Sequence, residues 1–407
     1  MRILYLHQYF NLPTDPGGTR SYEMARRLVA FGHKVVMITS ERHGKFAGRN
    51  WRVTNETGIE VHWLPVLYDN HMSYPQRIRA FVRFAIGASL RAAAIPADVV
   101  FATSTPLTIA IPGVYASKRQ KIPMVFEVRD LWPELPIAVG ALKGIMIPPA
   151  YWLENFAYKH SQKIVTLSPG MRDGVIKTGF PAEKICVIPN SADITLFQVP
   201  EETGLQFRAA TKWLQDNPLV LYAGTLGRIN GISYLVKLAA ETIKVAPKIR
   251  FLVVGDGAEW QKIESKAKKL GVYKNNFFMM HSVPKKDMPS IFSAATVAVS
   301  LFVDMPQMWA NSANKFFDAL ASGTPVAINY QGWQADLLKT TGAGIVLPAK
   351  EINVAASRLI DFLSAPERLA SAARTATKLA EIQFNRNHLT RQLETTLLEA
   401  VNDFHDQ

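Results

Sequence analysis

The sequence predicts an α/β protein made of two doubly wound parallel-sheet domains. Three observations carry this prediction. Short apolar runs alternate with helical patterns along all 407 residues. The runs are rich in Val, Ile and Phe, as strands buried on both faces of a parallel sheet are. The alternation stops near residue 190 and then starts again, which indicates two sheets rather than one.

The first array of strands and helices occupies residues 1–190. It opens with the strand-like RILYLHQYF (2–10). The helical SYEMARRLVAFG (21–32) follows and ends in Gly32, a residue typical of helix C-termini. Four further strands are expected, at KVVMITS (34–40), ADVVFATS (97–104), PMVFEVRD (123–130) and KIVTLS (163–168).

The second array occupies residues 191–382 and follows a break at PNSADITLFQVPEETG (189–204). Its expected strands are LVLYAGT (219–225), IRFLVVGDG (249–257), NFFMMHSV (276–283), TVAVSLF (296–302), PVAINY (325–330) and AGIVL (343–347). A helical stretch from about Ala355 to Phe404 is interrupted near residues 384–386, so residues 383–407 form a separate terminal segment.

Composition excludes several classes of protein. Cys186 is the single cysteine, so neither a disulfide framework nor a multi-cysteine metal site can form. The N-terminal MRILYLHQYF lacks a long apolar core and a cleavage site, so we expect a strand there and not a signal peptide. No run of about 18 uncharged apolar residues occurs, so we expect no membrane span and a cytoplasmic location.

The net charge of +13 favours an anionic partner, which could be nucleic acid, an anionic membrane or a phosphorylated substrate. The Lys and Arg residues are scattered, with no zinc-finger spacing and no aromatic RNA-binding pattern. We therefore expect a membrane surface or a phosphorylated substrate and no nucleic acid.

In open parallel sheets, ligands bind beyond the carboxyl ends of the strands. After the first strand, Gly17 and Gly18 lead into a helix that starts near Thr19 and Arg20. The pattern is not GxGxxG, which argues against a dinucleotide site. Backbone N–H groups of a Gly-Gly loop could still approach an anion, although a plain turn is the alternative.

Glu127, Arg129 and Asp130 close the strand expected at 123–130. Asp130 could simply cap the helix that follows. Alternatively, Arg129 and Asp130 face the ligand-binding edge of the sheet.

Four consecutive strand ends of the second array carry glycine turns or small polar residues. The turn at 222–231 contains Gly224, Thr225, Arg228 and Asn230, and the next strand closes with Gly255, Asp256 and Gly257. His281 and Val283 close the third strand. Each signal is weak alone, but together they outline one nucleotide-sized cleft.

The fourth strand end leads to NSANKFFDALASGTPVAIN (311–329). Small residues at a helix N-terminus let a phosphate approach the free N–H groups, and Lys315 adds a charge. Asp318 lies three residues further on, where a carboxylate could accept hydrogen bonds from ribose hydroxyls. The alternative is an ordinary helix capped by Ser312 or Asn314, with Lys315 solvated.

These motifs together resemble the GT-B-fold glycosyltransferases of the large retaining family 4. The similarity is greatest to the bacterial surface-polysaccharide branch with O-antigen L-fucosamine (N-acetyl-L-fucosamine) transferases. The motifs are PGGTR (16–20), FEVRDLWPE (126–134), VIPN (187–190), YAG (222–224), VGDG (254–257), NKFFD (314–318) and GTPV (323–326).

The resemblance implies two Rossmann-like domains facing across a cleft, with the C-terminal helix (383–407) packing back on the N-terminal domain. The N-terminal domain would bind the acceptor through Thr19, Arg20 and Glu127. The C-terminal domain would bind a nucleotide-sugar donor. The implied donor contacts are Gly17, Gly18, Gly224, Thr225, Asn230, Gly255, Asp256, Gly257, His281, Val283, Ser312, Ala313, Asn314 and Asp318.

Three positions depart from the family pattern. The Arg and Lys that many relatives carry after the first strand of the second domain are Thr225 and Asn230 here, and Arg228 could supply the charge. The family's two glutamates correspond to Ala310 and Asp318. The usual histidine before the aspartate is Arg129.

A retaining transfer on this fold requires stabilisation of the leaving diphosphate, for which Arg228 and Lys315 are the candidates. Asp130, next to Arg129, would orient the acceptor or take its proton. No paired carboxylates follow a strand, so we expect no metal and no other cofactor.

Residues 74–94, YPQRIRAFVRFAIGASLRAAA, predict a basic amphipathic helix. Its wheel places Ile78, Phe81, Val82 and Ile86 on one side, with Arg77, Arg79, Arg83 and Arg91 largely on the other. A further apolar segment, LKGIMIPP, covers residues 142–149. We expect peripheral binding to an anionic membrane, although a helix with its apolar side in the core is the alternative.

The lead interpretation is transfer of a 6-deoxy amino sugar from a UDP donor to an undecaprenyl-diphosphate-linked N-acetylglucosamine. This would take place at the inner face of the bacterial inner membrane. Two alternatives stay open: a UDP-sugar 2-epimerase of the same fold, and a non-catalytic nucleotide-sugar-binding scaffold.

Overall fold

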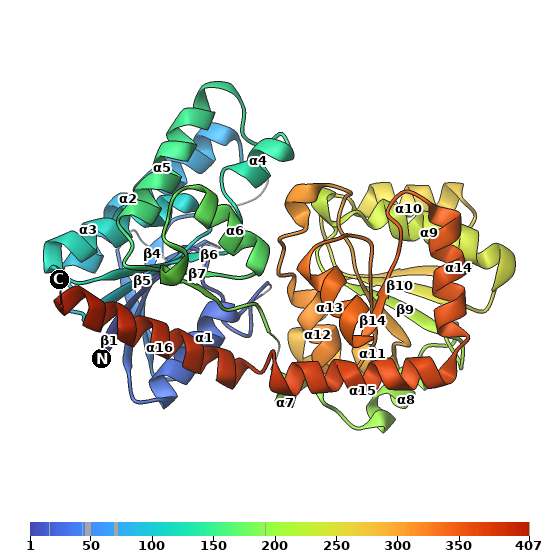
Figure 1. Cartoon of the computed structure of the whole chain (residues 1–407). Helices are drawn as coiled ribbons and strands as arrows, with labels where there is room; N and C mark the ends of the chain where they lie inside the picture. The colour runs from blue at the N-terminus through green and yellow to red at the C-terminus, as the bar shows by residue number, and fades with distance from the viewer. Residues whose placement is uncertain (16, 43, 45–49, 69–71, 192, 407) are drawn as a thin grey trace. The chain divides into compact units, whose positions relative to one another are not determined.

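The computed structural model describes residues 1–15, 17–42, 44, 50–68, 72–191 and 193–406. It divides into two compact units. The first consists of Met1–Pro189 and Asn387–Gln407, and the second of Asn190–Arg386. Each unit contains one sheet with helices on both of its faces (Figure 1).

The first unit is built on an eight-stranded sheet of order β3-β4-β2-β1-β5-β6-β7-β8. All pairs are parallel except β3–β4. The strands are β1 (Arg2–Leu6), β2 (Lys34–Glu41), β3 (Arg52–Glu56), β4 (Ile59–Pro65), β5 (Val99–Thr103), β6 (Met124–Val128), β7 (Lys163–Thr166) and β8 (Ile185–Val187). The helices are α1 (Arg20–Ala30), α2 (Tyr74–Ala93), α3 (Ala110–Gln120), α4 (Glu134–Ala138), α5 (Ile147–Lys159) and α6 (Pro169–Lys177), with 3-10 turns η1 (Leu107–Ile109), η2 (Gly144–Met146) and η3 (Ala182–Lys184).

The second unit is built on a six-stranded, fully parallel sheet of order β11-β10-β9-β12-β13-β14. The strands are β9 (Leu219–Ala223), β10 (Arg250–Val254), β11 (Phe277–Met280), β12 (Val297–Ser300), β13 (Val326–Ile328) and β14 (Gly344–Val346). The helices are α7 (Ile194–Phe197), α8 (Glu201–Ala210), α9 (Ile232–Val245), α10 (Trp260–Lys269), α11 (Met288–Ala294), α12 (Asn314–Ala321), α13 (Trp333–Thr341), α14 (Ile352–Leu363) and α15 (Pro366–Ile382), with 3-10 turns η4 (Arg228–Asn230), η5 (Lys285–Asp287) and η6 (Pro306–Met308).

The prediction of two doubly wound parallel sheets is confirmed, and all eleven predicted strands occur in the structure. Three strands were not predicted: β3, β4 and β8. β3 has a polar, exposed sequence, RVTNE, and β8 is only three residues long, so neither has the long apolar run of a buried strand. The long helical stretch is three helices, since it also breaks at residues 364–365.

Both faces of the first sheet are buried, as the alternation along β1 demonstrates. Leu4 and Leu6 belong to the core cluster under α2, α3 and α5, whereas Ile3 and Tyr5 belong to the cluster on the opposite face. That opposite face is covered by α1 and by the last helix, α16 (Arg386–His405), which lie side by side in Figure 1.

The C-terminal helix α16 packs on the first sheet, as expected. Its leucines 389, 393 and 397 and Ala400 are spaced so that one stripe enters the core with Met24 and Leu28 of α1. Burial of this stripe explains why the end of the chain returns to the first unit.

This packing predicts the effect of Leu393→Ala. Leu393 is fully buried, so the truncation should lower the free energy of unfolding by about 2–5 kcal/mol. Leu398→Ala is the matched control, because Leu398 lies on the same helix and is 42% exposed. Equal thermal unfolding midpoints for the two variants would contradict the proposed burial of the stripe.

Candidate functional site

Arg20 and Glu127 form a buried ion pair at the carboxyl edge of the first sheet. Arg20 donates to Oε1 of Glu127 from Nε at 3.0 Å and from Nη2 at 2.9 Å. It also donates to the carbonyls of Ile188 (2.9 Å) and Pro189 (2.7 Å). The Oε2 of Glu127 accepts from Thr103 at 3.0 Å.

Arg20 and Glu127 are therefore bound to the protein itself, at the point where the chain leaves the first unit. Thr19 is also buried, and its carbonyl accepts from Glu23 to open α1. The expected contact of these three residues with an acceptor stays a prediction, and their observed role is structural.

The Gly-Gly loop before α1 needs at least one of its glycines. Gly17 has φ of +114°, and a Cβ on it would lie 2.9 Å from Nδ2 of Asn11. That amide donates to the carbonyl of Gly18 at 3.2 Å. Pro16 lies outside the described residues.

Arg129 and Asp130 follow β6, as predicted, and meet a third group that the sequence reasoning did not select. The Arg129 backbone N–H donates to Oγ of Ser104 at 3.0 Å, and its Nη1 lies 3.4 Å from Nε2 of His7. His7 comes directly after β1, and burial with two nearby arginines holds its pKa well below the usual 6.5. His7 is therefore neutral and accepts from Arg129.

Asp130 is the acid next to Arg129 at this edge. Burial raises the pKa of its carboxyl to about 6, and the charge of Arg129 only partly opposes the shift. The alternative that Asp130 caps α4 is wrong, because α4 begins after Pro133 with no side-chain cap. A carboxylate with this pKa can accept a proton near neutral pH.

Loops of the second unit approach each other so closely that glycine is required. A Cβ on Gly255 would lie 1.9 Å from the carbonyl oxygen of Gly224, and one on Gly257 would lie 2.5 Å from that of Leu226. The Gly224 N–H donates to Val254 at 2.9 Å, and the Leu226 N–H donates to Asp256 at 2.8 Å. The turns after β9 and β10 are thus joined by backbone hydrogen bonds and form one continuous surface.

Lys315 is a cation without a carboxylate partner among the described residues. Its Nζ donates to Oδ1 of Asn230 at 3.0 Å and lies 5.1 Å and 4.7 Å from the ring centroids of Tyr222 and Phe302. Burial lowers its pKa to about 7. A bound anion would restore the charged form, so this place suits a phosphate.

The start of α12 is uncapped, which overturns the alternative of an ordinary capped helix. The N-cap is Ala313, and no side chain caps the first turn. Ser312 is used elsewhere: its Oγ accepts from the Asn190 N–H at 3.0 Å, and its carbonyl accepts from Nδ2 of Asn190 at 2.6 Å. Asn314 is exposed. The first N–H groups of α12 are thus available beside Lys315.

Asp318, one turn into α12, lies near two cations. Burial raises the pKa of its carboxyl, while Lys285 and Arg386 lower it. Arg386 is itself held by the carbonyl of Ser191 at 2.5 Å. Sequence reasoning missed Lys285, although it directly follows the His281–Pro284 segment.

Asp256 and His281 form an exposed pair. His281 Nδ1 and Asp256 Oδ1 are 2.5 Å apart, and Asp256 also accepts from the backbone N–H (2.9 Å) and hydroxyl of Ser282. These bonds lower the pKa of Asp256 to about 2. The His281 ring stacks on Trp260 at 4.1 Å and 9°. Trp260 was not predicted, and it extends a flat aromatic surface beside the glycine turns.

Three further predicted residues have simpler surroundings. Thr225 is exposed, and its carbonyl accepts from the Tyr222 hydroxyl at 2.9 Å. Val283 is half-buried. Arg228 is exposed in η4 and forms no hydrogen bond or ion pair within the described part of the chain.

A second surface of the first unit lies on α2. Its exposed side carries Ile78, Val82, Ile86 and Leu90, spaced four residues apart and 39–63% exposed. Phe84, Ala88 and Ala92 on the other side enter the core. The alternative of a core-facing helix is therefore confirmed for that side, but it is wrong for the predicted stripe, whose Ile78, Val82 and Ile86 are exposed.

The predicted basic face of α2 is smaller than expected. Arg79 and Arg83 are exposed, but Arg77 donates to the Met72 carbonyl at 3.0 Å and Arg91 to Nδ1 of His62 at 2.8 Å. Phe81 also leaves the stripe, since it stacks on Tyr68 at 5.6 Å.

The neighbouring helices of the same layer add exposed apolar side chains, namely Ile111, Tyr115, Ile145, Met146, Tyr151 and Trp152. Ile145 is 89% exposed, whereas Leu142 of the predicted apolar loop is buried. Across the described ranges, no helix combines the length and hydropathy needed to cross a membrane.

Comparisons with known proteins match most of the chain. The family described as "Glycosyl transferase 4-like domain" matches residues 17–191, and "Glycosyl transferases group 1" matches residues 205–379. The chain is 24% identical over 281 residues to an Escherichia coli K12 protein, covering 65% of this chain and 68% of that protein. The name of that protein assigns it to colanic acid biosynthesis as a glycosyl transferase (WcaI).

Solved structures share the fold at low sequence identity. HepE from Anabaena, in complex with UDP-glucose, has a TM-score of 0.72 and 17% identity over 98% of this chain and all of that chain. WaaG, a glycosyltransferase involved in lipopolysaccharide biosynthesis, has a TM-score of 0.70 and 16% identity over 97% of this chain and 99% of that chain.

The raised pKa of Asp130 predicts a pH dependence of any reaction in which it accepts a proton. The carboxylate form exists above its pKa of about 6, so kcat/KM should fall about tenfold per pH unit below 6 and level off above it. Asp130→Asn should remove this acid limb along with most of the activity. An unchanged limb in the residual activity of the variant would show that another group titrates.

Proposed function

Because the chain belongs to the GT-B glycosyltransferases that join a glycosyl transferase 4-like domain to a group 1 domain, we propose that it transfers a sugar from a UDP donor with retention of configuration. The acceptor is an undecaprenyl-diphosphate-linked N-acetylglucosamine, and the sugar is N-acetyl-L-fucosamine. The product enters a bacterial surface polysaccharide such as O-antigen. The family matches favour a transferase over a UDP-sugar 2-epimerase or a non-catalytic scaffold.

The observation that carries the proposal is the unpaired Lys315 beside the uncapped start of α12. A cation without a carboxylate and a set of free N–H groups suit a diphosphate. The glycine turns after β9 and β10 bring the backbone close to the ligand, and the His281–Trp260 stack provides a flat surface for the uracil base. HepE, which shares this fold, binds UDP-glucose.

In the transfer, charge develops on the diphosphate as the bond to the sugar breaks. Lys315 and the N–H groups of α12 stabilise that charge, and Arg228 is free to add a second cation. In the first unit, Asp130 orients the acceptor hydroxyl or takes its proton, with Arg129 held beside it by Ser104 and His7. The proposed reaction uses no metal ion.

The exposed apolar residues of α2, α3 and α5 support binding to a membrane, where a polyisoprenyl acceptor resides. We place the enzyme at the inner face of the bacterial inner membrane, with Arg79 and Arg83 toward anionic headgroups. The name of the E. coli relative, which assigns it to colanic acid biosynthesis, supports the class of product.

A transfer assay tests the proposal directly. UDP should be released only when UDP-N-acetyl-L-fucosamine and the lipid-linked acceptor are both present, and the product should retain the anomeric configuration of the donor. Asp318→Ala should raise the donor KM roughly ten- to a hundredfold, because about 1.5–3 kcal/mol is lost with hydrogen bonds to a charged group.

Asp336→Ala is the matched control, since Asp336 is an exposed aspartate of the same unit. UDP release without an acceptor at the full rate, or no release with any UDP-sugar, would contradict the transferase proposal. An equal donor KM for the two variants would show that Asp318 does not bind the donor.

Membrane binding through α2 is tested with Ile86→Gln/Leu90→Gln. These side chains are 60% and 63% exposed, so their replacement should not disturb the core. Each fully buried Leu or Ile contributes about 1.5–3 kcal/mol, so flotation with anionic liposomes should weaken at least tenfold.

The control is Val245→Gln, which removes a still more exposed apolar side chain (75%) from the second unit. Binding of the parent protein should also weaken at high salt, because the charges on Arg79 and Arg83 are then screened. Flotation of the double variant at the level of the control would contradict docking through α2.

A further inference from the structure

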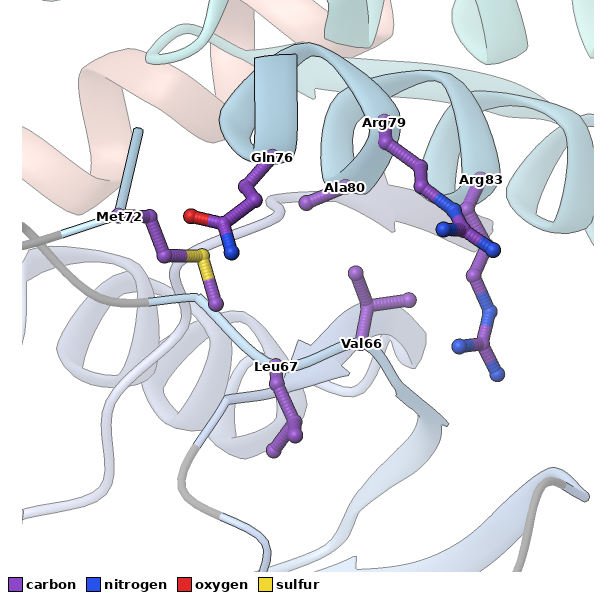
Figure 2. A pocket seen from close by; sticks show the side chains of 7 residues that line it. All are labelled: Val66, Leu67, Met72, Gln76, Arg79, Ala80 and Arg83. Carbon is purple, nitrogen blue, oxygen red and sulfur yellow. The ribbon is translucent and has the colours of Figure 1, made fainter. Parts of the chain in front are cut away.

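A pocket of about 600 Å³ opens between α2 and the side chains of Val66, Leu67 and Met72. Figure 2 shows Val66 pointing toward α2, with Met72 and Gln76 at one end of the pocket and Arg79 and Arg83 at the other. All of these belong to the first unit. The pocket is thus lined by apolar side chains on one part and by two cations on another.

The polarity of the lining defines the ligand. Val66 and Ala80 are buried, and Leu67 is 58% exposed although it is apolar. Arg79 and Arg83 are exposed and form no ion pair within the described residues, and none of the described residues that line the pocket is acidic. An apolar chain with a negatively charged head complements this arrangement. The chain would contact the apolar side chains, and the head would contact the two arginines.

The position of the pocket connects it with the active site. Val66 and Leu67 directly follow β4, so the pocket lies at the carboxyl edge of the sheet, where ligands bind. β4 is separated from β1 by β2 alone, so two strand spacings, ~10 Å, lie between the pocket and the end of β1. Arg42, which follows β2, adds a cation between them.

The pocket also adjoins the membrane-facing stripe of α2. Arg79 and Arg83 alternate along the helix with Ile78, Val82 and Ile86 of the stripe. An amphiphile whose chain lies in the bilayer can therefore enter the pocket without leaving the interface.

We propose that this pocket binds the polyisoprenyl diphosphate part of the acceptor. Its apolar lining holds the first isoprene units, and Arg79 and Arg83 hold the diphosphate, so that the sugar extends toward the end of β1. This proposal rests on the proposed function and names the part of the acceptor that the first unit recognises.

Binding is tested by calorimetry with farnesyl diphosphate, and UDP is kept at saturation to occupy the diphosphate site of the second unit. Farnesyl diphosphate should bind at least tenfold more tightly than inorganic pyrophosphate or farnesol. Arg79→Gln/Arg83→Gln should weaken it at least tenfold. Leu67→Ser should weaken farnesyl diphosphate and leave pyrophosphate unchanged.

Two matched variants complete the experiment. Lys118→Gln/Arg119→Gln removes the same charge from exposed positions of α3 and should bind like the parent. Ile86→Gln/Leu90→Gln should also leave the Kd for farnesyl diphosphate unchanged, which separates the pocket from bilayer docking. Equal binding of pyrophosphate and farnesyl diphosphate, or equal loss in the α3 control, would overturn the proposal.

Turnover separates this proposal from the proposed function. With the lipid-linked acceptor, Arg79→Gln/Arg83→Gln should raise the acceptor KM tenfold or more. With a water-soluble acceptor that lacks the isoprenoid and the diphosphate, the same variant should match the parent. Transfer with an unchanged KM for the lipid would overturn the pocket alone, whereas no transfer to either acceptor would overturn the function.

Discussion

A buried lysine close to two aromatic rings, with an amide as its hydrogen-bond partner, is the feature on which the proposed site of the second unit depends. Lys315 lies near the rings of Tyr222 and Phe302, and burial lowers its pKa to about 7, so its charge is costly until an anion arrives. The N–H groups at the uncapped start of α12 also favour a bound anion. The glycine turns after β9 and β10 bring the backbone close to the same proposed site.

Both units use the same edge of a parallel sheet for different tasks. In the second unit, Lys315 and the first N–H groups of α12 lie at this edge, and such donors suit a nucleotide diphosphate. In the first unit it collects Arg129, a neutral His7 and an acid with a raised pKa, which suits a hydroxyl that must lose a proton. The pocket beside β4 and the apolar stripe of α2 lie on the same unit, where we propose that a lipid-linked acceptor binds.

Periodicity and composition predicted the two sheets, because long Val- and Ile-rich runs are specific for buried parallel strands. They did not predict β3, which is polar. They also did not predict which contacts single residues make at the strand ends. Arg20 and Glu127 illustrate the limit: their motif was recognised, but only the fold reveals that they bind each other. His7, Trp260 and the Asn190–Ser312 bonds depend on contacts between distant segments, which spacing along one segment does not specify.

The most direct measurement is the proton uptake that accompanies UDP binding, obtained by calorimetry at pH 8 in buffers of different ionisation enthalpy. Lys315 has a pKa of about 7 in the empty protein and is mostly neutral at this pH, whereas a bound diphosphate raises its pKa. We expect uptake of most of one proton in the parent protein and none in Lys315→Met. Binding of UDP with no proton uptake, or the same uptake in the variant, would contradict the role of Lys315 as the diphosphate ligand.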